Sequence, residues 1–132
     1  MQRYMLDTNT ASFAIKNNPG VRAKLTKVSP SDVFISVITE AELLFGVERR
    51  PDNPKLRQAV EEFLKRINVL SWDTDTAKQY ALIRAKLEKV GKPMGNMDIL
   101  IAAHAVSSGL VLVTNDKVFK NVDNLKIEDW VE

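Results

Sequence analysis

The stretch Leu110-Val111-Leu112-Val113-Thr114 is the clearest strand in this sequence, and the fold is deduced outward from it. It is apolar up to Thr114, which is typical of a parallel strand covered on both faces. An acidic residue, Asp116, follows it after one intervening position. Because ligands bind at the carboxyl edge of a parallel sheet, Asp116 is a candidate site residue.

Three further acids lie at the edges of apolar segments: Asp7 after residues 4–6, Glu42 six residues after residues 33–36, and Asp98 before residues 99–105. We expect their carboxylates to converge with that of Asp116 at the carboxyl edge of the sheet. Converging carboxylates repel one another and need a cation, and hard oxygen ligands suit Mg²⁺ or Mn²⁺. A divalent ion in an acidic pocket is a common apparatus for phosphodiester hydrolysis.

Each acid also has a structural interpretation. Asp7 and Asp98 could cap a helix or stabilise its first turn. Glu42 could complete a capping box that begins at Thr39, and Asp116 could form an Asx turn. All four together favour a site, because a fold that needed only caps could use Ser or Thr at several of these points.

The remaining sequence predicts an α/β fold with a mostly parallel central sheet flanked by helices. The expected strands are residues 4–6, 33–36, 69–70, 110–114 and 126–127, and the expected helices include residues 21–28, 39–45, 55–67, 74–90 and the segment after Asp98. In the helix that Asp73 would cap, we expect these residues to face inward: Ala77, Tyr80, Ala81, Ile83, Leu87 and Val90.

Composition limits the class of protein. The 132 residues suffice for one domain, which we expect to span residues 1–132, and the absence of Cys excludes disulfides and zinc–thiolate sites. No stretch is long and apolar enough to span a membrane, and the N-terminus lacks the apolar core of a signal peptide, so we expect a cytoplasmic protein. The net charge of +2 does not by itself indicate nucleic acid. Four clustered cations could contact RNA or form a solvated helix face: Arg84, Lys86, Lys89 and Lys92.

His104 is the only histidine. It lies six positions beyond Asp98, or about 240° around an ideal helix, so we expect it to point away from the acids and to be packed or bonded to backbone. No nucleophilic triad, P-loop or dinucleotide motif is present. An aspartate-nucleophile phosphatase would need a second Asp two residues after Asp7, where this chain has Asn9.

Four segments resemble the PIN-domain ribonucleases and, more narrowly, the VapC toxins of bacterial toxin–antitoxin pairs: Met5-Leu6-Asp7-Thr8-Asn9, Thr39-Glu40-Ala41-Glu42-Leu43, residues 95–105 around Asp98, and Leu112-Val113-Thr114-Asn115-Asp116. The resemblance implies that Asp7, Glu42, Asp98 and Asp116 are catalytic. It further implies that Asp7 and Asp98 are the metal ligands and that Asn9 and Thr114 are polar supports. Glu40 is an alternative to Glu42, but the two diverge by about 200° on a helix, so only one can face the site.

The resemblance also implies a function and partners. The chain would be a Mg²⁺- or Mn²⁺-dependent endoribonuclease, the toxin of a type II pair, neutralised by a VapB-type antitoxin and forming a homodimer. Its substrate would be tRNA, with the anticodon stem-loop of initiator tRNA as the leading candidate. The alternative is a non-catalytic PIN-like module that binds RNA or protein. Four apolar residues near the N-terminus could line an antitoxin groove or belong to the core: Phe13, Ile15, Leu44 and Phe45.

Overall fold

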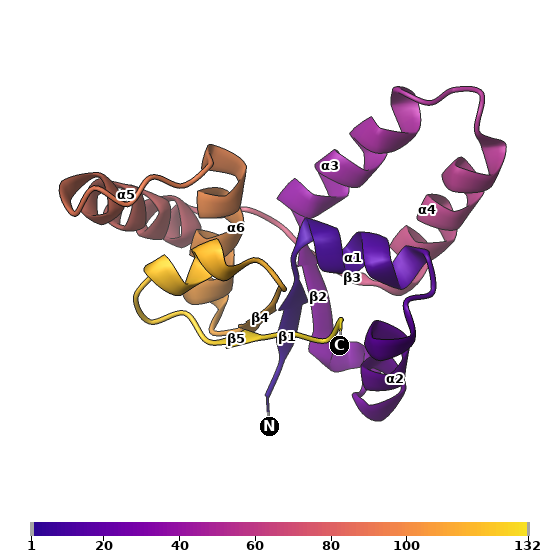
Figure 1. The fold of residues 1–132 in the computed structure, drawn as a ribbon, viewed down its shortest axis with the longest axis horizontal. Helices are drawn as coiled ribbons and strands as arrows, with labels where there is room; N and C mark the ends of the chain where they lie inside the picture. Colours follow the sequence, from indigo (N-terminus) through magenta and orange to yellow (C-terminus); the bar gives the residue numbers. More distant parts are fainter. Residues whose placement is uncertain (1, 132) are drawn as a thin grey trace.

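The computed structural model describes residues 2–131 and has a parallel sheet at its centre (Figure 1). The sheet has five strands in the order β3-β2-β1-β4-β5, and every neighbouring pair is parallel. The strands are β1 (Tyr4–Leu6), β2 (Val33–Ser36), β3 (Asn68–Leu70), β4 (Val111–Val113) and β5 (Ile127–Glu128). The prediction of an α/β fold with a parallel central sheet is confirmed.

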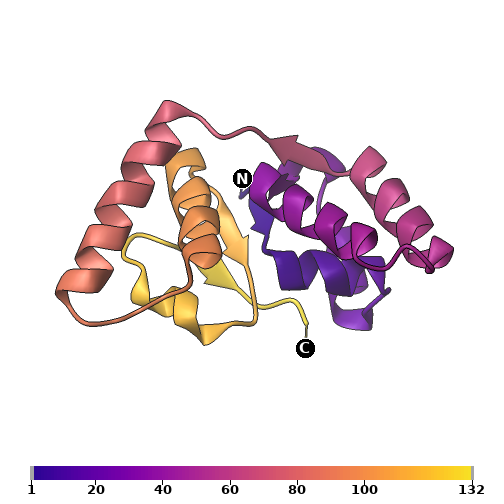
Figure 2. The same cartoon turned by 90° about the horizontal axis from the view of Figure 1, so that it is seen from above.

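Helices cover both faces of this sheet (Figures 1 and 2). On one side lie α1 (Thr8–Ile15), α2 (Pro19–Lys27), α3 (Val37–Glu48) and α4 (Pro54–Arg66), and on the other lie α5 (Thr74–Lys89) and α6 (Asn96–Ser108). Two 3₁₀ helices, η1 (Pro30–Asp32) and η2 (Lys117–Asn121), complete the described segments. Within residues 2–131, no helix combines the length and apolarity needed to cross a bilayer.

The central strands direct alternate side chains into two apolar layers. On β1, Leu6 packs into the layer beneath α1 to α4, whereas Met5 packs into the layer that includes Ile101 and Ala102 of α6. Met5, Leu6 and the central β4 residue Leu112 are fully buried. Burial on both faces explains why these strands are continuously apolar rather than alternating.

The start of α3 differs from the sequence prediction. The helix begins at Val37 and Ser36 caps it, since the Ser36 hydroxyl accepts a hydrogen bond from the Ile38 N–H at 3.0 Å. The capping box expected at Thr39 is therefore wrong, and Thr39 is buried inside the first turn. The helix also continues past Gly46 to Glu48, because one glycine costs a helix only about 1 kcal/mol, which packing can offset.

The inward face of α5 is narrower than predicted. The helix bounds agree with the expectation and Asp73 caps the first turn, accepting from the Thr76 N–H at 2.8 Å. However, Ala77, Ala81 and Val90 are exposed. One side of α5 packs along α6, so only a narrow apolar stripe of the helix is covered.

Candidate active site

The order of the strands brings the four acids to one edge of the sheet. Strands β1, β2 and β4 are parallel neighbours, so their carboxyl ends lie side by side. Asp7 follows β1 directly, and Asp116 lies just beyond β4. Glu42 lies on α3, which begins directly after β2, and Asp98 lies in the first turn of α6.

Asp7 is buried and rigidly held, with 4% of its surface exposed. Its backbone N–H donates to the Val113 carbonyl at 3.0 Å, which ties the end of β1 to the end of β4. Its Oδ1 accepts from the Thr10 N–H at 2.8 Å, so Asp7 caps α1. Burial raises the pKa of Asp7, the hydroxyl of Thr114 and the bonds from Thr10 lower it, and the charge of Asp116 raises it further.

Glu42 is oriented by two threonines from neighbouring segments. The Thr8 hydroxyl donates to Glu42 Oε1 at 2.6 Å, and its oxygen lies 3.1 Å from the Thr39 hydroxyl. Because the Thr8 proton is used toward Glu42, Thr39 must be the donor in the second bond. This chain of hydroxyl groups fixes Glu42 beside the N-terminus of α1.

Asp98 has a different environment from the other three acids. It is half-buried, and within residues 2–131 no hydrogen-bond donor contacts its carboxylate. The N-cap of α6 is Gly95, which has no side chain, so Asp98 is not a side-chain cap. Burial raises the pKa of Asp98, and the negative charges of Asp116, Asp7 and Glu42 raise it further. Asp98 therefore experiences the charge of all three other acids and has no donor to offset it.

Glu42, rather than Glu40, faces these acids. Glu42 contributes to the raised pKa of Asp98 and accepts the bond from Thr8, whereas Glu40 appears in neither interaction. Both residues lie on α3, and their different environments agree with the angular separation expected on a helix.

Asp116 and the two predicted supports, Thr114 and Asn9, differ in their burial and hydrogen bonds. Asp116 is exposed, caps η2 by accepting from the Val118 N–H at 3.0 Å, and donates its own N–H to the Thr114 hydroxyl at 3.0 Å. Thr114 is buried and contacts both Asp116 and Asp7, and its role as a support stays a prediction. Asn9 is exposed, and the described residues give its side chain no hydrogen bond.

The donor chemistry of this edge fits a hard divalent cation. In the part of the chain that the structure describes, no three His or acidic side chains are arranged closely enough to enclose a metal, so the four carboxylates are less tightly gathered than the sequence predicts. Mg²⁺ is usually held by one or two carboxylates and keeps several waters, so two of these acids suffice for a Mg²⁺ site. Buried Asp7 and donor-free Asp98 are the side chains suited to this role, and a cation beside them would relieve the mutual repulsion of the four charges.

His104 lies outside the acidic group, as its position on the helix predicted. It is 1% exposed, and its Nδ1 lies 2.7 Å from the Ser36 hydroxyl while its Nε2 lies 3.1 Å from the Ser71 carbonyl. Since a carbonyl can only accept, the proton resides on Nε2, and Ser36 donates to Nδ1. Burial lowers the pKa of His104, so the ring is neutral and joins α6 to the start of α3 and to the segment after β3.

Thr8 and Thr39 are site residues that the sequence alone did not identify. Thr8 comes directly after the strand-end acid Asp7, and this adjacency is the sequence feature that could have identified Thr8 as a site residue. Thr39 lies one helical turn before Glu42, where a hydroxyl on the same face can share its contacts. Neither contact could be inferred without knowing that β1 and β2 are neighbours.

The chain is similar to proteins of known family over almost its whole length. The PIN domain family matches residues 4–125. The "tRNA(fMet)-specific endonuclease VapC" of Salmonella typhimurium is 41% identical over 131 residues, covering 98% of this chain and 99% of that protein. "Ribonuclease VapC2" of Haemophilus influenzae is 38% identical over 132 residues, covering 99% of this chain and all of that protein.

Solved structures agree with these relatives. The DNA-bound VapBC structure from Salmonella typhimurium contains a chain that superimposes with a TM-score of 0.91 at 42% identity, covering 98% of this chain and 99% of that chain. The VapBC2 structure from Rickettsia felis, bound to a promoter DNA fragment, gives a TM-score of 0.90 at 32% identity with the same coverage. The fold, the acids at its sheet edge and these similarities lead to one conclusion: the chain belongs to the PIN domain family and, within it, to the VapC ribonucleases.

Proposed function

We propose that the chain is a metal-dependent endoribonuclease that acts in the cytoplasm as the toxin of a type II toxin–antitoxin pair. The observation that carries the proposal is the environment of Asp98, whose pKa is raised by burial and then by the charges of Asp116, Asp7 and Glu42, while within residues 2–131 no donor contacts it. Within residues 2–131 none of the four acids is paired with a basic side chain. Gathering four carboxylates without a cation is unfavourable, so their arrangement favours a bound divalent cation, either Mg²⁺ or Mn²⁺.

In the proposed reaction the acids have separate roles. Asp7 and Asp98 would hold the cation, which when bound supplies a water of lowered pKa and a Lewis acid for the phosphate. Glu42 is fixed through Oε1 by Thr8, and its Oε2, which accepts no hydrogen bond within residues 2–131, would accept a proton from the attacking water. Asp116 would add negative charge at the rim, and Thr114 would keep Asp7 in place. No side-chain nucleophile is required, which agrees with His104 lying in the core.

The proposed substrate is tRNA, with the anticodon stem-loop of initiator tRNA as the first candidate. The support comes from relatives in Salmonella typhimurium and Shigella flexneri, both described as tRNA(fMet)-specific endonucleases and 41% and 38% identical to this chain. Sequencing of RNA ends after brief expression tests the substrate. We expect new 5′ ends confined to one position of initiator tRNA, and ends dispersed over many RNAs would contradict the assignment.

We also propose that a VapB-type antitoxin neutralises the protein and that the toxin forms a homodimer. Solved neighbours from Rickettsia felis, Salmonella typhimurium and Haemophilus influenzae are VapBC structures. A basic antitoxin side chain would be attracted to the same negatively charged edge that favours a cation. Co-expression tests the pairing, since the antitoxin should restore growth and co-purify with the toxin, and light scattering of the purified toxin tests the dimer.

The alternative function is a non-catalytic PIN-like module that binds RNA or protein. It would predict acids retained for structural contacts alone. Asp7 and Asp116 do make such contacts, whereas Asp98 makes none within residues 2–131. A purified protein that binds RNA but leaves it intact in Mg²⁺ and in Mn²⁺ would favour the module.

A further inference from the structure

A groove leads away from the acidic edge between α1, α3 and α4. Its volume is about 520 Å³, and Thr8 and Glu42 form part of its wall. The wall continues with Ser12 on α1 and with Leu43 and Val60, which are buried at its base. The groove therefore joins the proposed catalytic acids to a surface that could hold several residues of a ligand.

Three cations line this groove: Lys16, Arg49 and Arg50. Within residues 2–131, none of them has a carboxylate within 4.0 Å. Nearby cations on α4 differ, because Arg57 pairs with Glu48 and Arg66 pairs with Glu62. Uncompensated positive charge beside a groove is what a polyanion would neutralise.

An exposed aromatic ring lies on the same wall. Phe45 is 63% exposed and its neighbour Leu44 is 44% exposed, whereas Leu43 and Val47 of the same helix are buried. The guanidinium of Arg49 lies 5.6 Å from the centroid of the Phe45 ring. Unstacked RNA bases stack on aromatic rings and on guanidinium planes, so this pair offers a surface for a base.

We propose that a single-stranded RNA segment next to the scissile phosphate lies in this groove. Its phosphates would contact Lys16, Arg49 and Arg50, and one base would stack on Phe45. The inference rests on the proposed ribonuclease function, and it adds where and how the substrate is held. Single-stranded RNA fits better than duplex RNA, since only unpaired bases present a face to Phe45.

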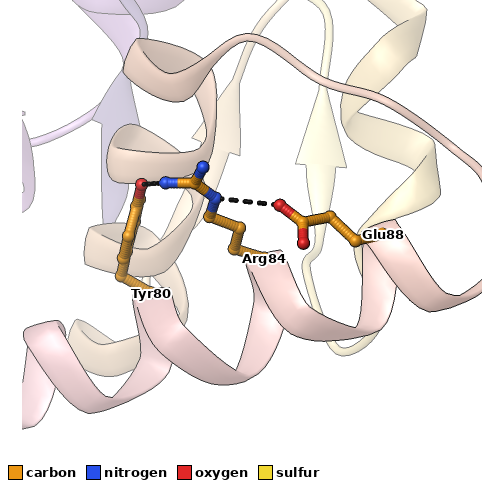
Figure 3. Close-up of polar contacts among 3 residues, drawn as sticks. All are labelled: Tyr80, Arg84 and Glu88. Carbon is orange, nitrogen blue, oxygen red and sulfur yellow. Dashed lines mark hydrogen bonds and ion pairs between the residues drawn. The ribbon is translucent and has the colours of Figure 1, made fainter.

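The basic cluster on α5 is a weaker candidate for the same role. Arg84 donates to the Tyr80 hydroxyl at 2.9 Å and to Glu88 at 3.1 Å, so its guanidinium is already engaged (Figure 3). Lys86 is paired with Asp123. This helix also lies across the sheet from α1, α3 and α4 (Figure 2), which line the groove. We therefore assign the RNA contacts to the groove cations rather than to Arg84 and Lys86, and the expectation for the α5 cluster stays a prediction that the control variant below tests.

The test measures RNA binding separately from cleavage. Fluorescence anisotropy of a labelled single-stranded oligouridylate would be followed with the full chain in EDTA, over a series of salt concentrations. The Arg49→Gln/Arg50→Gln variant should bind about tenfold more weakly and flatten the slope of log K against log salt by about 1.4, since each phosphate contact contributes about 0.7. Phe45→Leu should also weaken binding about tenfold.

The matched control is Arg84→Gln/Lys86→Gln, which removes the same charge from α5. It should leave both the affinity and the salt slope unchanged. Equal effects of the two double variants, or no effect of the groove variant, would overturn the groove proposal. A groove variant that binds RNA normally but loses the VapB-type antitoxin would overturn it in favour of a protein-docking surface.

A parallel cleavage assay keeps the two proposals distinguishable. With tRNA and Mg²⁺, the groove variant should show a raised KM and an unchanged kcat, because Arg49 and Arg50 would hold the substrate without contacting the reacting atoms. Wild-type protein that cleaves RNA while the groove variants bind normally would overturn only the groove. Wild-type protein that cleaves no RNA under any divalent ion would overturn the ribonuclease function itself.

Discussion

At the scale of single residues, the four acids are not equivalent. Asp7 and Asp116 each satisfy a helix terminus, and Glu42 accepts a bond from Thr8, so each has a structural task besides any chemistry. Asp98 has none of these contacts within the described residues, yet it experiences the charge of the other three. Asp98 is thus the acid that the fold needs least, and it best distinguishes a catalytic role of the four acids from a structural one.

Asp98→Asn should therefore leave the metal-free protein as stable as the wild type or more stable. The carboxyl pKa is raised above 3.8 in the folded state, so the folded protein binds this proton more tightly than the unfolded chain. The contribution of Asp98 to stability consequently falls as pH rises from 3.8 through the folded pKa. Thermal melting in EDTA across this range should show a weaker decline for the variant, and a variant that melts far below wild type would identify Asp98 as a structural residue.

Asp7→Ala provides a contrasting control. It relieves the same repulsion but removes the side-chain cap on α1, which is worth about 1 kcal/mol. Metal-free Asp7→Ala should accordingly be less stable than metal-free Asp98→Asn in urea unfolding. The reverse order would show that the cap contributes little at this site.

Thr8→Val tests whether the Thr8 hydroxyl positions Glu42 for catalysis as well as stabilising the fold. Valine keeps the shape of threonine and removes the hydroxyl that donates to Glu42 Oε1. We expect a loss of about 1 kcal/mol in unfolding free energy and a lower kcat, with activity recovered in Thr8→Ser. Equal kcat values for all three proteins would mean that Glu42 needs no orientation by Thr8.

At the scale of elements, periodicity predicted most of the fold. Residues 111–113 and 74–89 form the strand and helix expected, because a continuous apolar run and a regular apolar spacing leave few alternatives. The start of α3 was misplaced because Ser36 and Thr39 are both good capping residues. Only the structure shows that Ser36 caps the helix, while Thr39 bonds to Thr8. The exposure of the side chains along α5 could not be predicted from the sequence either, since it depends on how α5 packs on α6.

The site could be predicted as far as its charged residues and no further. Acids at strand ends can be recognised in the sequence because the strands themselves can. The parallel order of the strands then places these acids at one edge of the sheet. The hydroxyl groups of Thr8 and Thr39 depend on contacts across 31 and 34 residues of sequence, which no local pattern encodes. The groove cations were missed for the same reason, since Lys16 and Arg50 meet only when α1 and α3 pack together.

His104 joins three elements, and this gives the fold a pH dependence of its own. Burial lowers its pKa below 6.5, so the unfolded chain binds a proton more readily than the folded protein. The contribution of His104 to stability is therefore fully present above pH 6.5 and is lost as the pH falls through the folded pKa. Urea unfolding of the wild type should show this decline, and it should be absent in His104→Gln. A wild-type profile that is flat below pH 6.5 would contradict the assignment of a neutral, bonded ring.

At the scale of the whole molecule, the sheet order turns four distant segments into one negatively charged edge with a positively charged groove beside it. A ligand that binds only the folded state stabilises it by an amount that grows with the logarithm of the ligand excess over Kd. Saturating Mg²⁺ should hence raise the melting temperature of the wild type, with about 2.7 kcal/mol expected at a hundredfold excess over Kd. Asp98→Asn should show a much smaller increase, and equal increases would place the ion elsewhere.

The most direct test of the central claim is cleavage of initiator tRNA by the purified protein. Wild type should cut it at one position in Mg²⁺ or Mn²⁺, and both EDTA and Asp98→Asn should abolish the cut while the protein stays folded. The Arg84→Gln/Lys86→Gln variant should retain full activity. This control would show that substitution of charged residues does not in general abolish cleavage. Cleavage that persists in EDTA, or at full rate in Asp98→Asn, would contradict the account.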